Sequence, residues 1–354
     1  MKRIVHIVGT GTIGEPLIGL FTDFRDKFEI DEVTFHKRTP LASDRSRIQH
    51  LMGRGARLVT EPESVTAFEG MGHTVSFEAQ EALERATVVI DCTPAGNENK
   101  KKLYSKLSGP AGFLAQGSEF GFGKPYARGV NDEALDADED RFIQIVSCNT
   151  HNIATLIKTI AGNDAGGFDL DRATFVCMRR ANDITQVDSF LPAPSVGKHG
   201  DEEFGTHHAR DAFHLFETLD ERLDLFSSAV KLNTQYMHSI WFQLQLDRDS
   251  SVEEVVDRLH ANHRVAVTDK AHSNLIFSFG RDHGYYGRIL SQTVVVVPSL
   301  LVRHKREVVG FCFTPQDGNS LLSSVAAALW RMNPDWDDLA QKLQPIRRWL
   351  YQEI

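Results

Sequence analysis

A cysteine stands where the sequence changes from a strand pattern to a helix pattern. Cys148 follows the apolar run 142–146 and precedes the helical pattern 153–157. The first turn of a helix has backbone N–H groups without helical partners and the positive end of the helix dipole, and both favour an anion. A thiolate is such an anion and is the nucleophilic form of cysteine. We interpret Cys148 as a nucleophile with a lowered thiol pKa; the alternative is a small buried core residue.

A glycine loop near the start of the chain has the spacing of a dinucleotide-binding turn. Its three glycines, spaced G-x-G-x-x-G, follow the strand pattern 3–8 and precede the helix pattern 16–28. Such glycines allow a tight bend, close approach to a pyrophosphate and close helix packing. The predicted cofactor loop comprises Gly9, Gly11, Thr12, Ile13 and Gly14. Together with Cys148, it indicates an enzyme that holds an aldehyde on sulfur and passes hydride to a nicotinamide.

The turn after the second strand bears on the choice of cofactor. A site specific for NAD would place Asp or Glu after the strand 31–36 to bind the ribose 2′-hydroxyl. This chain has Lys37, Arg38 and Thr39 there instead. Two cations and a hydroxyl suit a 2′-phosphate, so we predict NADP, or the use of both NADP and NAD. The alternative is a solvated basic turn.

Composition excludes several classes of partner. The chain has 354 residues and a formal net charge of −9, whereas a nucleic-acid-binding protein would favour a basic face. The sequence has no run of about 18 apolar residues, so it predicts no membrane span. The four cysteines are far apart, with neither a disulfide framework nor a zinc-ligand spacing. We therefore expect no nucleic acid, no membrane and no metal, and a reducing cytoplasm as the location.

The organisation of the chain predicts an α/β protein. Strand and helix patterns alternate in the first part, which is typical of a doubly wound parallel sheet. The later strand patterns 175–180, 239–246 and 293–297 favour a mixed or antiparallel sheet. We predict a Rossmann-type dinucleotide-binding domain at 1–147 and an α+β catalytic domain at 148–318. A helical tail at 319–354 is expected to pack back on the first domain.

Seven short segments occur in one order along the chain. They are Gly9–Gly14, Lys37-Arg38-Thr39-Pro40, Asp91-Cys92-Thr93-Pro94-Ala95-Gly96, Ser147-Cys148-Asn149-Thr150, Arg179-Arg180-Ala181 with Asp183, His207-His208, and Met237-His238 before a strand. In this order they resemble the archaeal-type (type II) glyceraldehyde-3-phosphate dehydrogenases. The resemblance covers most of the chain as islands between divergent stretches.

The resemblance implies roles for particular residues. Cys148 would be the nucleophile and His238 the general base. Spacing alone makes His151 a local rival for the role of base, because it follows Cys148 by three residues, within one helical turn. Further cofactor-binding residues would be Thr93, Pro94 and Gly96. The implied substrate-binding residues are Asn149, Thr150, His151, Arg179, Arg180, His207 and His208. A homotetramer or homodimer formed through second-domain sheets is also implied.

The chain departs from the family pattern after the nucleophile. His151-Asn152 replaces the family's Thr-Gly, and Ala209-Arg210 replaces the Gly-Pro that follows the histidine pair. We therefore expect a variant phosphorylated or unphosphorylated aldehyde, with glyceraldehyde 3-phosphate or inorganic phosphate used poorly. Two alternatives remain open: a semialdehyde dehydrogenase that reduces an acyl phosphate, and a non-catalytic cofactor-sensing homologue.

Overall fold

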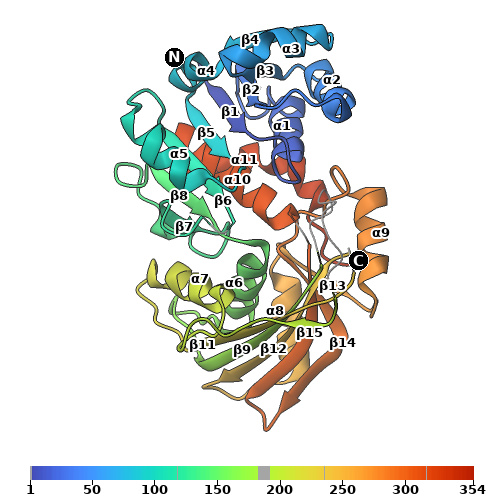
Figure 1. Cartoon of the computed structure of the whole chain (residues 1–354). Coiled ribbons are helices and arrows are strands. Elements are labelled where there is room, and N and C mark those ends of the chain that lie inside the picture. The colour runs from blue at the N-terminus through green and yellow to red at the C-terminus, as the bar shows by residue number, and fades with distance from the viewer. Residues whose placement is uncertain (1, 118, 182–191, 235, 316) are drawn as a thin grey trace. The chain divides into compact units, whose positions relative to one another are not determined.

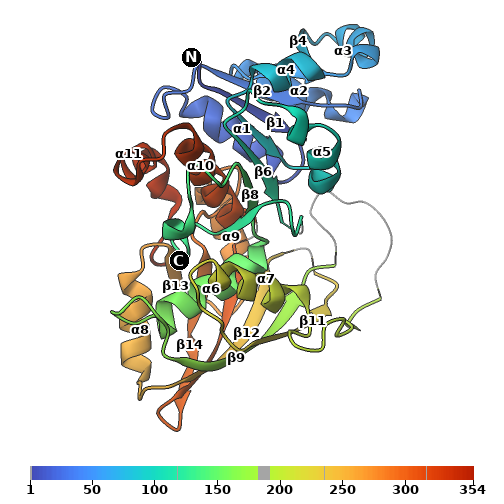
Figure 2. The same ribbon diagram turned by 90° about the vertical axis from the view of Figure 1, so that its left-hand side faces the viewer.

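The computed structural model describes residues 2–117, 119–181, 192–234, 236–315 and 317–354. The chain forms two compact units. The first comprises Met1–Lys124, Leu135–Ile145 and Leu321–Pro345; the second comprises Pro125–Ala134, Val146–Ser320 and Ile346–Ile354. Figures 1 and 2 show the elements of both units from two directions. The functional domain boundaries at residues 147 and 318 stay a prediction.

The first unit is built on an eight-stranded sheet in the order β4-β3-β2-β1-β5-β6-β8-β7. Its strands are β1 (Ile4–Val8), β2 (Glu32–His36), β3 (Arg57–Thr60), β4 (Val75–Glu78), β5 (Val88–Asp91), β6 (Gly112–Gln116), β7 (Lys124–Tyr126) and β8 (Phe142–Ile145). Neighbours from β4 to β8 pair in parallel. Strands β1, β5 and β6 are buried along their whole length, as expected where helices cover both faces of a sheet.

The helices of this unit are mostly short. They are α1 (Gly14–Asp23), α2 (Arg45–Gly53), α3 (Val65–Gly70), α4 (Ala79–Arg85), α5 (Gly96–Lys102), α10 (Gly318–Met332), which belongs to this unit from Leu321, and α11 (Trp336–Lys342). The sequence pattern extended the first helix to residue 28, which is wrong. The helix ends at Asp23, and Phe28 continues its apolar spacing only because it packs on Phe21 and Phe24 from a turn.

The chain order reverses between the neighbouring strands β1 and β5. Right-handed crossovers leaving this point in opposite directions place helices on opposite faces and open a crevice at the carboxyl ends of the strands. The loops after β1 and β5 meet there, because a Cβ atom added to Gly9 would lie 3.1 Å from Cγ2 of Thr93. The backbone N–H of Gly9 also donates to the carbonyl of His36 at the end of β2.

The second unit contains a seven-stranded mixed sheet in the order β10-β11-β9-β12-β15-β14-β13. Its strands are β9 (Leu170–Arg179), β10 (Ser195–Val196), β11 (Leu225–Lys231), β12 (His238–Leu246), β13 (Val265–Thr268), β14 (Thr293–Arg303) and β15 (Glu307–Thr314). Strands β9 and β11 pair in parallel, as do β13 and β14, whereas β12 pairs antiparallel with both β9 and β15. The predicted fold class, a Rossmann-type domain plus a mixed-sheet α+β domain, is confirmed.

Among the described residues, the α-helices that lie wholly in the second unit are α6 (Cys148–Ala161), α7 (His207–Glu217), α8 (Val252–Ala261) and α9 (Ser273–His283). Helices α6 and α7 lie side by side (Figures 1 and 2). Strand β12 alternates buried and half-buried residues, and its inner residues share one apolar core with α6, α7 and α8. None of the helices in the described part of the chain has the length and apolar character that a membrane crossing requires.

Candidate active site

Cys148 is the first residue of α6. The preceding Ser147 has an extended backbone, and its side chain caps the helix by accepting the Thr150 backbone N–H at 3.3 Å. The hydroxyls of Ser147 and Thr150 lie 2.9 Å apart. Thr150 is fully buried, and its backbone N–H and hydroxyl both contact the capping Ser147. Its role in substrate binding stays a prediction. From the other side, Asn319 Nδ2 donates to the Cys148 carbonyl at 2.9 Å.

The pKa of Cys148 is raised to about 12, so the predicted lowering is wrong for this structure. Burial of the thiol is the largest cause, and the carboxylate of Asp317 acts in the same direction. Arg180, Arg179 and the Asn149 backbone N–H lower the pKa by less. The helix terminus and the cations do favour the thiolate, but loss of water disfavours it more. Sequence spacing shows the helix terminus and does not show the burial.

His238 is tied to the residue that follows Cys148. It is the first residue of β12, and its Nδ1 lies 3.0 Å from Oδ1 of Asn149. The same Oδ1 accepts the hydroxyl proton of Thr314 at 3.1 Å. Because an amide oxygen only accepts, Nδ1 of His238 carries the proton and Nε2 is the basic nitrogen of the neutral ring. Burial, Arg180 and Arg179 lower the pKa of His238 to about 3, so the ring is neutral at physiological pH.

Two further residues extend this hydrogen-bonded chain. Asn152 Nδ2 donates to Oγ1 of Thr314 at 2.9 Å, and the Cys312 thiol donates to Oδ1 of Asn152 at 3.3 Å. Asn152, Thr314 and Cys312 are fully buried. Buried polar groups that satisfy one another hold each side chain in one orientation. Asn152, a departure from the family pattern, is therefore part of the support of His238, which sequence spacing did not reveal.

His151 has a different environment from the one expected of a substrate ligand. Its ring is fully buried, and Nδ1 lies 3.0 Å from the Ser147 carbonyl one turn earlier in the chain. Burial lowers its pKa to about 4. These contacts support a structural role for His151. Its predicted roles in substrate binding and as a rival base stay predictions.

A cluster of basic side chains lies near this chain of hydrogen bonds. Arg179 ends β9, and His207 and His208 begin α7 with ring centroids 4.0 Å apart. His208 is buried, and neither ring nitrogen has a hydrogen-bond partner among the described residues. Its pKa is lowered well below the usual range by burial and by His207, Arg179 and His238. These groups are placed where an anionic part of a substrate could bind.

The glycine loop fits a dinucleotide. Gly9 has a φ of +96°, which suits glycine, and a Cβ on Gly14 would lie 2.0 Å from the Gly9 carbonyl oxygen. A Cβ on Gly11 would meet nothing within 4 Å, so the backbone there is open to a ligand. No side chain caps the start of α1 at Ile13. In the first turn the Glu15 N–H donates to the Gly11 carbonyl and Pro16 has no N–H, so a pyrophosphate would be bound by the glycine-loop backbone and Gly14.

The predicted 2′-phosphate turn is joined to the glycine loop by ion pairs. Lys37 Nζ lies 2.6 Å from Asp44 Oδ2, and Arg47 pairs with Asp44 at 3.2 Å and with Glu15 at 3.1 Å. Glu15, at the start of α1, is thus held by a cation rather than directed at a pyrophosphate. Arg38 is exposed, as is Thr39. Of the two predicted cations, Lys37 is already paired.

The loop after β5 is fixed by Asp91, which is fully buried. Its Oδ1 accepts the backbone N–H and the hydroxyl of Thr93 at 2.9 and 2.6 Å. Its Oδ2 accepts from Asn99 and Tyr104, each at 2.7 Å. Pro94 follows in an exposed position, and a Cβ on Gly96 would lie 3.0 Å from the Cβ of Ala115. Asp91 therefore positions Thr93 at the crevice, a role the resemblance did not give it.

Within the described residues, no group of three or more His, Cys, Asp or Glu side chains is arranged to hold a metal.

The opposing charges around Cys148 lead to a prediction about its reactivity. Only the thiolate reacts with iodoacetamide, and the raised pKa keeps the thiol protonated, so the labelling rate should still be rising at about pH 9. Asp317→Asn removes a charge that raises the pKa and should speed labelling several-fold at about pH 8. Arg180→Gln should slow it, because this guanidinium lowers the pKa. Peptide mapping after brief alkylation measures both rates.

The control for these variants is Asp282→Asn, which removes an exposed carboxylate paired with Arg281. It should leave the labelling of Cys148 unchanged. A labelling rate that is flat between about pH 6 and pH 9 would show that the pKa of Cys148 is low, contrary to its burial.

No model of a known protein family matches the chain. It is, however, similar to curated proteins named glyceraldehyde-3-phosphate dehydrogenase. The protein of Methanobacterium formicicum is 28% identical over 277 residues, which are 75% of this chain and 74% of that protein. The protein of Sulfolobus acidocaldarius is 28% identical over 264 residues, which are 70% of this chain and 71% of that protein. The protein of Archaeoglobus fulgidus is 28% identical over 280 residues, which are 75% of this chain and 74% of that protein. The ordered motifs and these matches support the resemblance of the chain to the archaeal-type glyceraldehyde-3-phosphate dehydrogenases.

Proposed function

We propose that this protein is an NAD(P)-dependent dehydrogenase that oxidises an aldehyde through a covalent intermediate on Cys148. The relatives named glyceraldehyde-3-phosphate dehydrogenase are oxidoreductases that act on an aldehyde group, which supports the same type of reaction for this chain. The observation that carries the proposed mechanism is the hydrogen bond from His238 to Asn149, the residue next to Cys148. This hydrogen bond ties a neutral imidazole with a defined basic nitrogen to the helix turn that carries the Cys148 thiol.

The reaction begins with attack of Sγ of Cys148 on the carbonyl carbon. A sulfur–carbon bond forms and the carbonyl oxygen takes a proton, giving a thiohemiacetal. Because burial disfavours a free thiolate, the thiol proton leaves as this bond forms; Nε2 of His238 accepts this proton and passes it to the carbonyl oxygen. The glycine loop would hold a nicotinamide dinucleotide, and this group would supply the acceptor for the hydride on this carbon. His238 takes the hydroxyl proton as the carbonyl reforms, and phosphate or water then releases the acyl group from sulfur.

We propose NADP as the preferred cofactor, or the use of both NADP and NAD. The exposed Arg38 and Thr39 and the paired Lys37 support this proposal, since each can contribute to binding a 2′-phosphate. Asp44 opposes it in part, because it already neutralises Lys37. The balance between these groups sets the preference. We also propose the cytoplasm as the location, because all four cysteines are free.

We propose a small aldehyde, phosphorylated or not, as the substrate, bound in part by Arg179, Arg180, His207 and His208. A semialdehyde dehydrogenase working on an acyl phosphate is the second candidate, since the same Cys–His pair serves the reverse reaction. The hydrogen bond from His238 to the neighbour of Cys148 argues against a non-catalytic homologue, because a cofactor-sensing protein would not need it.

A homotetramer or homodimer is proposed from the outer face of the second sheet. Val176, Trp241 and Phe311 are register partners on three adjacent strands and face away from the core. Phe311 is 42% exposed and the nearby Leu301 is 53% exposed. Phe311→Asp should therefore lower the mass measured by light scattering. A mass near 39.7 kDa for the unaltered protein would contradict the proposal.

Removal of the nucleophile tests the mechanism. Cys148→Ser should abolish aldehyde oxidation and leave the dissociation constants of NADP and NAD unchanged, because the glycine loop belongs to the other unit. His238→Ala should lower kcat by about 10²- to 10⁴-fold, the usual contribution of a general base. His199→Ala is the matched control, since the His199 ring hydrogen-bonds Ser228 and contacts Phe226. If Cys148→Ser retains activity across an aldehyde panel, the covalent mechanism is wrong.

Cofactor preference is tested by two substitutions. Arg38→Ala should weaken NADP binding by about tenfold, because it removes a charge-assisted contact to the 2′-phosphate. Asp44→Asn should strengthen NADP binding, because it releases Lys37 and removes a negative charge. NAD, which lacks this phosphate, is the internal control and should bind equally in all three proteins. Fluorescence titration gives the dissociation constants. A tenfold preference of the unaltered protein for NAD, about 1.4 kcal/mol, would refute the proposed preference for NADP.

A further inference from the structure

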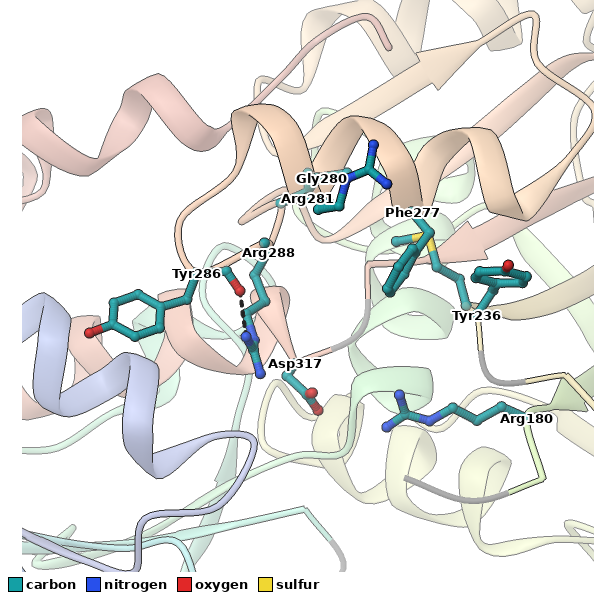
Figure 3. A pocket seen from close by; sticks show the side chains of 11 residues that line it. Arg180, Tyr236, Phe277, Gly280, Arg281, Tyr286, Arg288 and Asp317 are labelled. Carbon is teal, nitrogen blue, oxygen red and sulfur yellow. Dashed lines mark hydrogen bonds between the residues drawn. The ribbon is translucent and has the colours of Figure 1, made fainter. Parts of the chain in front are cut away.

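A cavity of about 220 Å³ lies in the second unit, beside the segments that carry the candidate catalytic residues. Its wall includes Met237, the neighbour of His238, together with Arg180 and Asp317, which both act on the pKa of Cys148. The remaining wall comes from Tyr236, from α9 and from the turn that follows α9 (Figure 3). Sites for drug-sized ligands have about 300–1,000 Å³, so this cavity suits a smaller metabolite.

One side of the cavity is apolar and aromatic. The rings of Tyr236 and Phe277 meet edge to face, with centroids 5.3 Å apart. Tyr236 is 46% exposed, although it lines a cavity with the buried Met237 and Ile289. Such a surface favours contact with carbon chains or rings rather than with a compact, hydrated polyol.

The opposite side is charged. Figure 3 shows Arg180 and Arg288 pointing toward Asp317 from two sides. Arg281 lies at the rim, but its side chain is exposed and bonds Asp282 and Ser278. The inward-facing charges are therefore two guanidiniums and one carboxylate, a net charge of +1. This balance matches a monoanionic carboxylate better than a phosphate, whose charge is about −1.5 to −2.

The turn that carries Arg288 is rigid and strained. Tyr285 and Arg288 exchange two backbone hydrogen bonds of 2.9 Å. Tyr286 between them has a φ of +48°, and Asp317 across the cavity has a φ of +64°. Both angles lie in the left-handed region, which residues other than glycine rarely adopt. Arg288 Nη1 donates to the Tyr286 carbonyl, which fixes the guanidinium. Backbone strain held in place around a cavity is typical of binding sites.

We propose that this cavity binds the substrate of the Cys148 reaction, and that this substrate is an aldehyde with an apolar segment ending in a carboxylate. The carboxylate binds Arg288, and the apolar segment lies against Tyr236 and Phe277. This inference rests on the proposed function, and it narrows the proposed small aldehyde to an ω-oxo acid.

Binding is tested first without chemistry, in the Cys148→Ser protein. The probes are pentanoate, propyl phosphate and 1-pentanol, with calorimetry as the measurement. Pentanoate should bind more tightly than either other probe. Arg288→Gln should weaken pentanoate binding by about tenfold, as expected for a lost bidentate contact, and leave 1-pentanol unaffected. Arg281→Gln removes the same charge from the rim and should change nothing.

Turnover is tested next, in the protein that retains Cys148. We expect 5-oxopentanoate to be oxidised with a lower KM than pentanal or glyceraldehyde 3-phosphate. Arg288→Gln should raise the KM for 5-oxopentanoate by about tenfold with little change in kcat, and Phe277→Ala should raise the KM for pentanal as well. The split between charged and uncharged aldehydes would not arise from a general loss of structure.

Two results would overturn the assignment. One is an equal effect of Arg288→Gln and Arg281→Gln on pentanoate binding. The other is efficient oxidation of glyceraldehyde 3-phosphate that Arg288→Gln does not alter; the proposed function would then stand and the cavity assignment would fail. Conversely, Arg288-dependent binding of pentanoate without oxidation of any aldehyde would support the cavity and refute the proposed function.

Discussion

Helix α6 enters the core of the second unit with a polar first turn, and the site follows from that constraint. Asn149, Thr150, His151 and Asn152 are all buried. A buried polar group without a partner costs about 1–3 kcal/mol, so each of these side chains needs one. Thr150 uses the cap, His151 uses a carbonyl of its own turn, and the two asparagines reach β12 and β15. The partner of Asn149 is the candidate base.

The same burial sets the electrostatics of the site. It raises the pKa of Cys148 and lowers that of His238, so the resting pair is a neutral thiol and a neutral imidazole. Arg179 and Arg180 favour the thiolate and disfavour the imidazolium. In the proposed mechanism the nucleophile is therefore a protonated thiol at rest, and its proton leaves only as the substrate is attacked. Such an arrangement limits side reactions of the thiol with other electrophiles.

The sequence predicted the features that depend on local patterns. The glycine loop, the parallel strands around β1 and β5, and the cysteine at the start of a helix each follow from periodicity and spacing within about twenty residues. Contacts between distant segments could not be predicted this way. Thr314 and Asn319 lie more than 160 residues from Cys148, and no spacing rule relates them to it. The prediction of a lowered pKa for Cys148 failed for a related reason, since the helix dipole can be inferred from a pattern and desolvation cannot. The cation turn was located correctly, but its neutralising partner Asp44 was not foreseen.

The hydrogen bonds that support His238 all run in one direction. Cys312 donates to Asn152, Asn152 to Thr314, and Thr314 to Asn149, where the proton of His238 arrives from the opposite side. Each hydroxyl or amide orientation is therefore dictated by the group before it, and Asn149 Oδ1 is the common end point. A residue at position 152 that could only accept would turn the Thr314 hydroxyl around and leave that oxygen with one donor fewer. The orientation of a histidine at the start of β12 is in this way linked to a thiol near the end of the neighbouring strand β15.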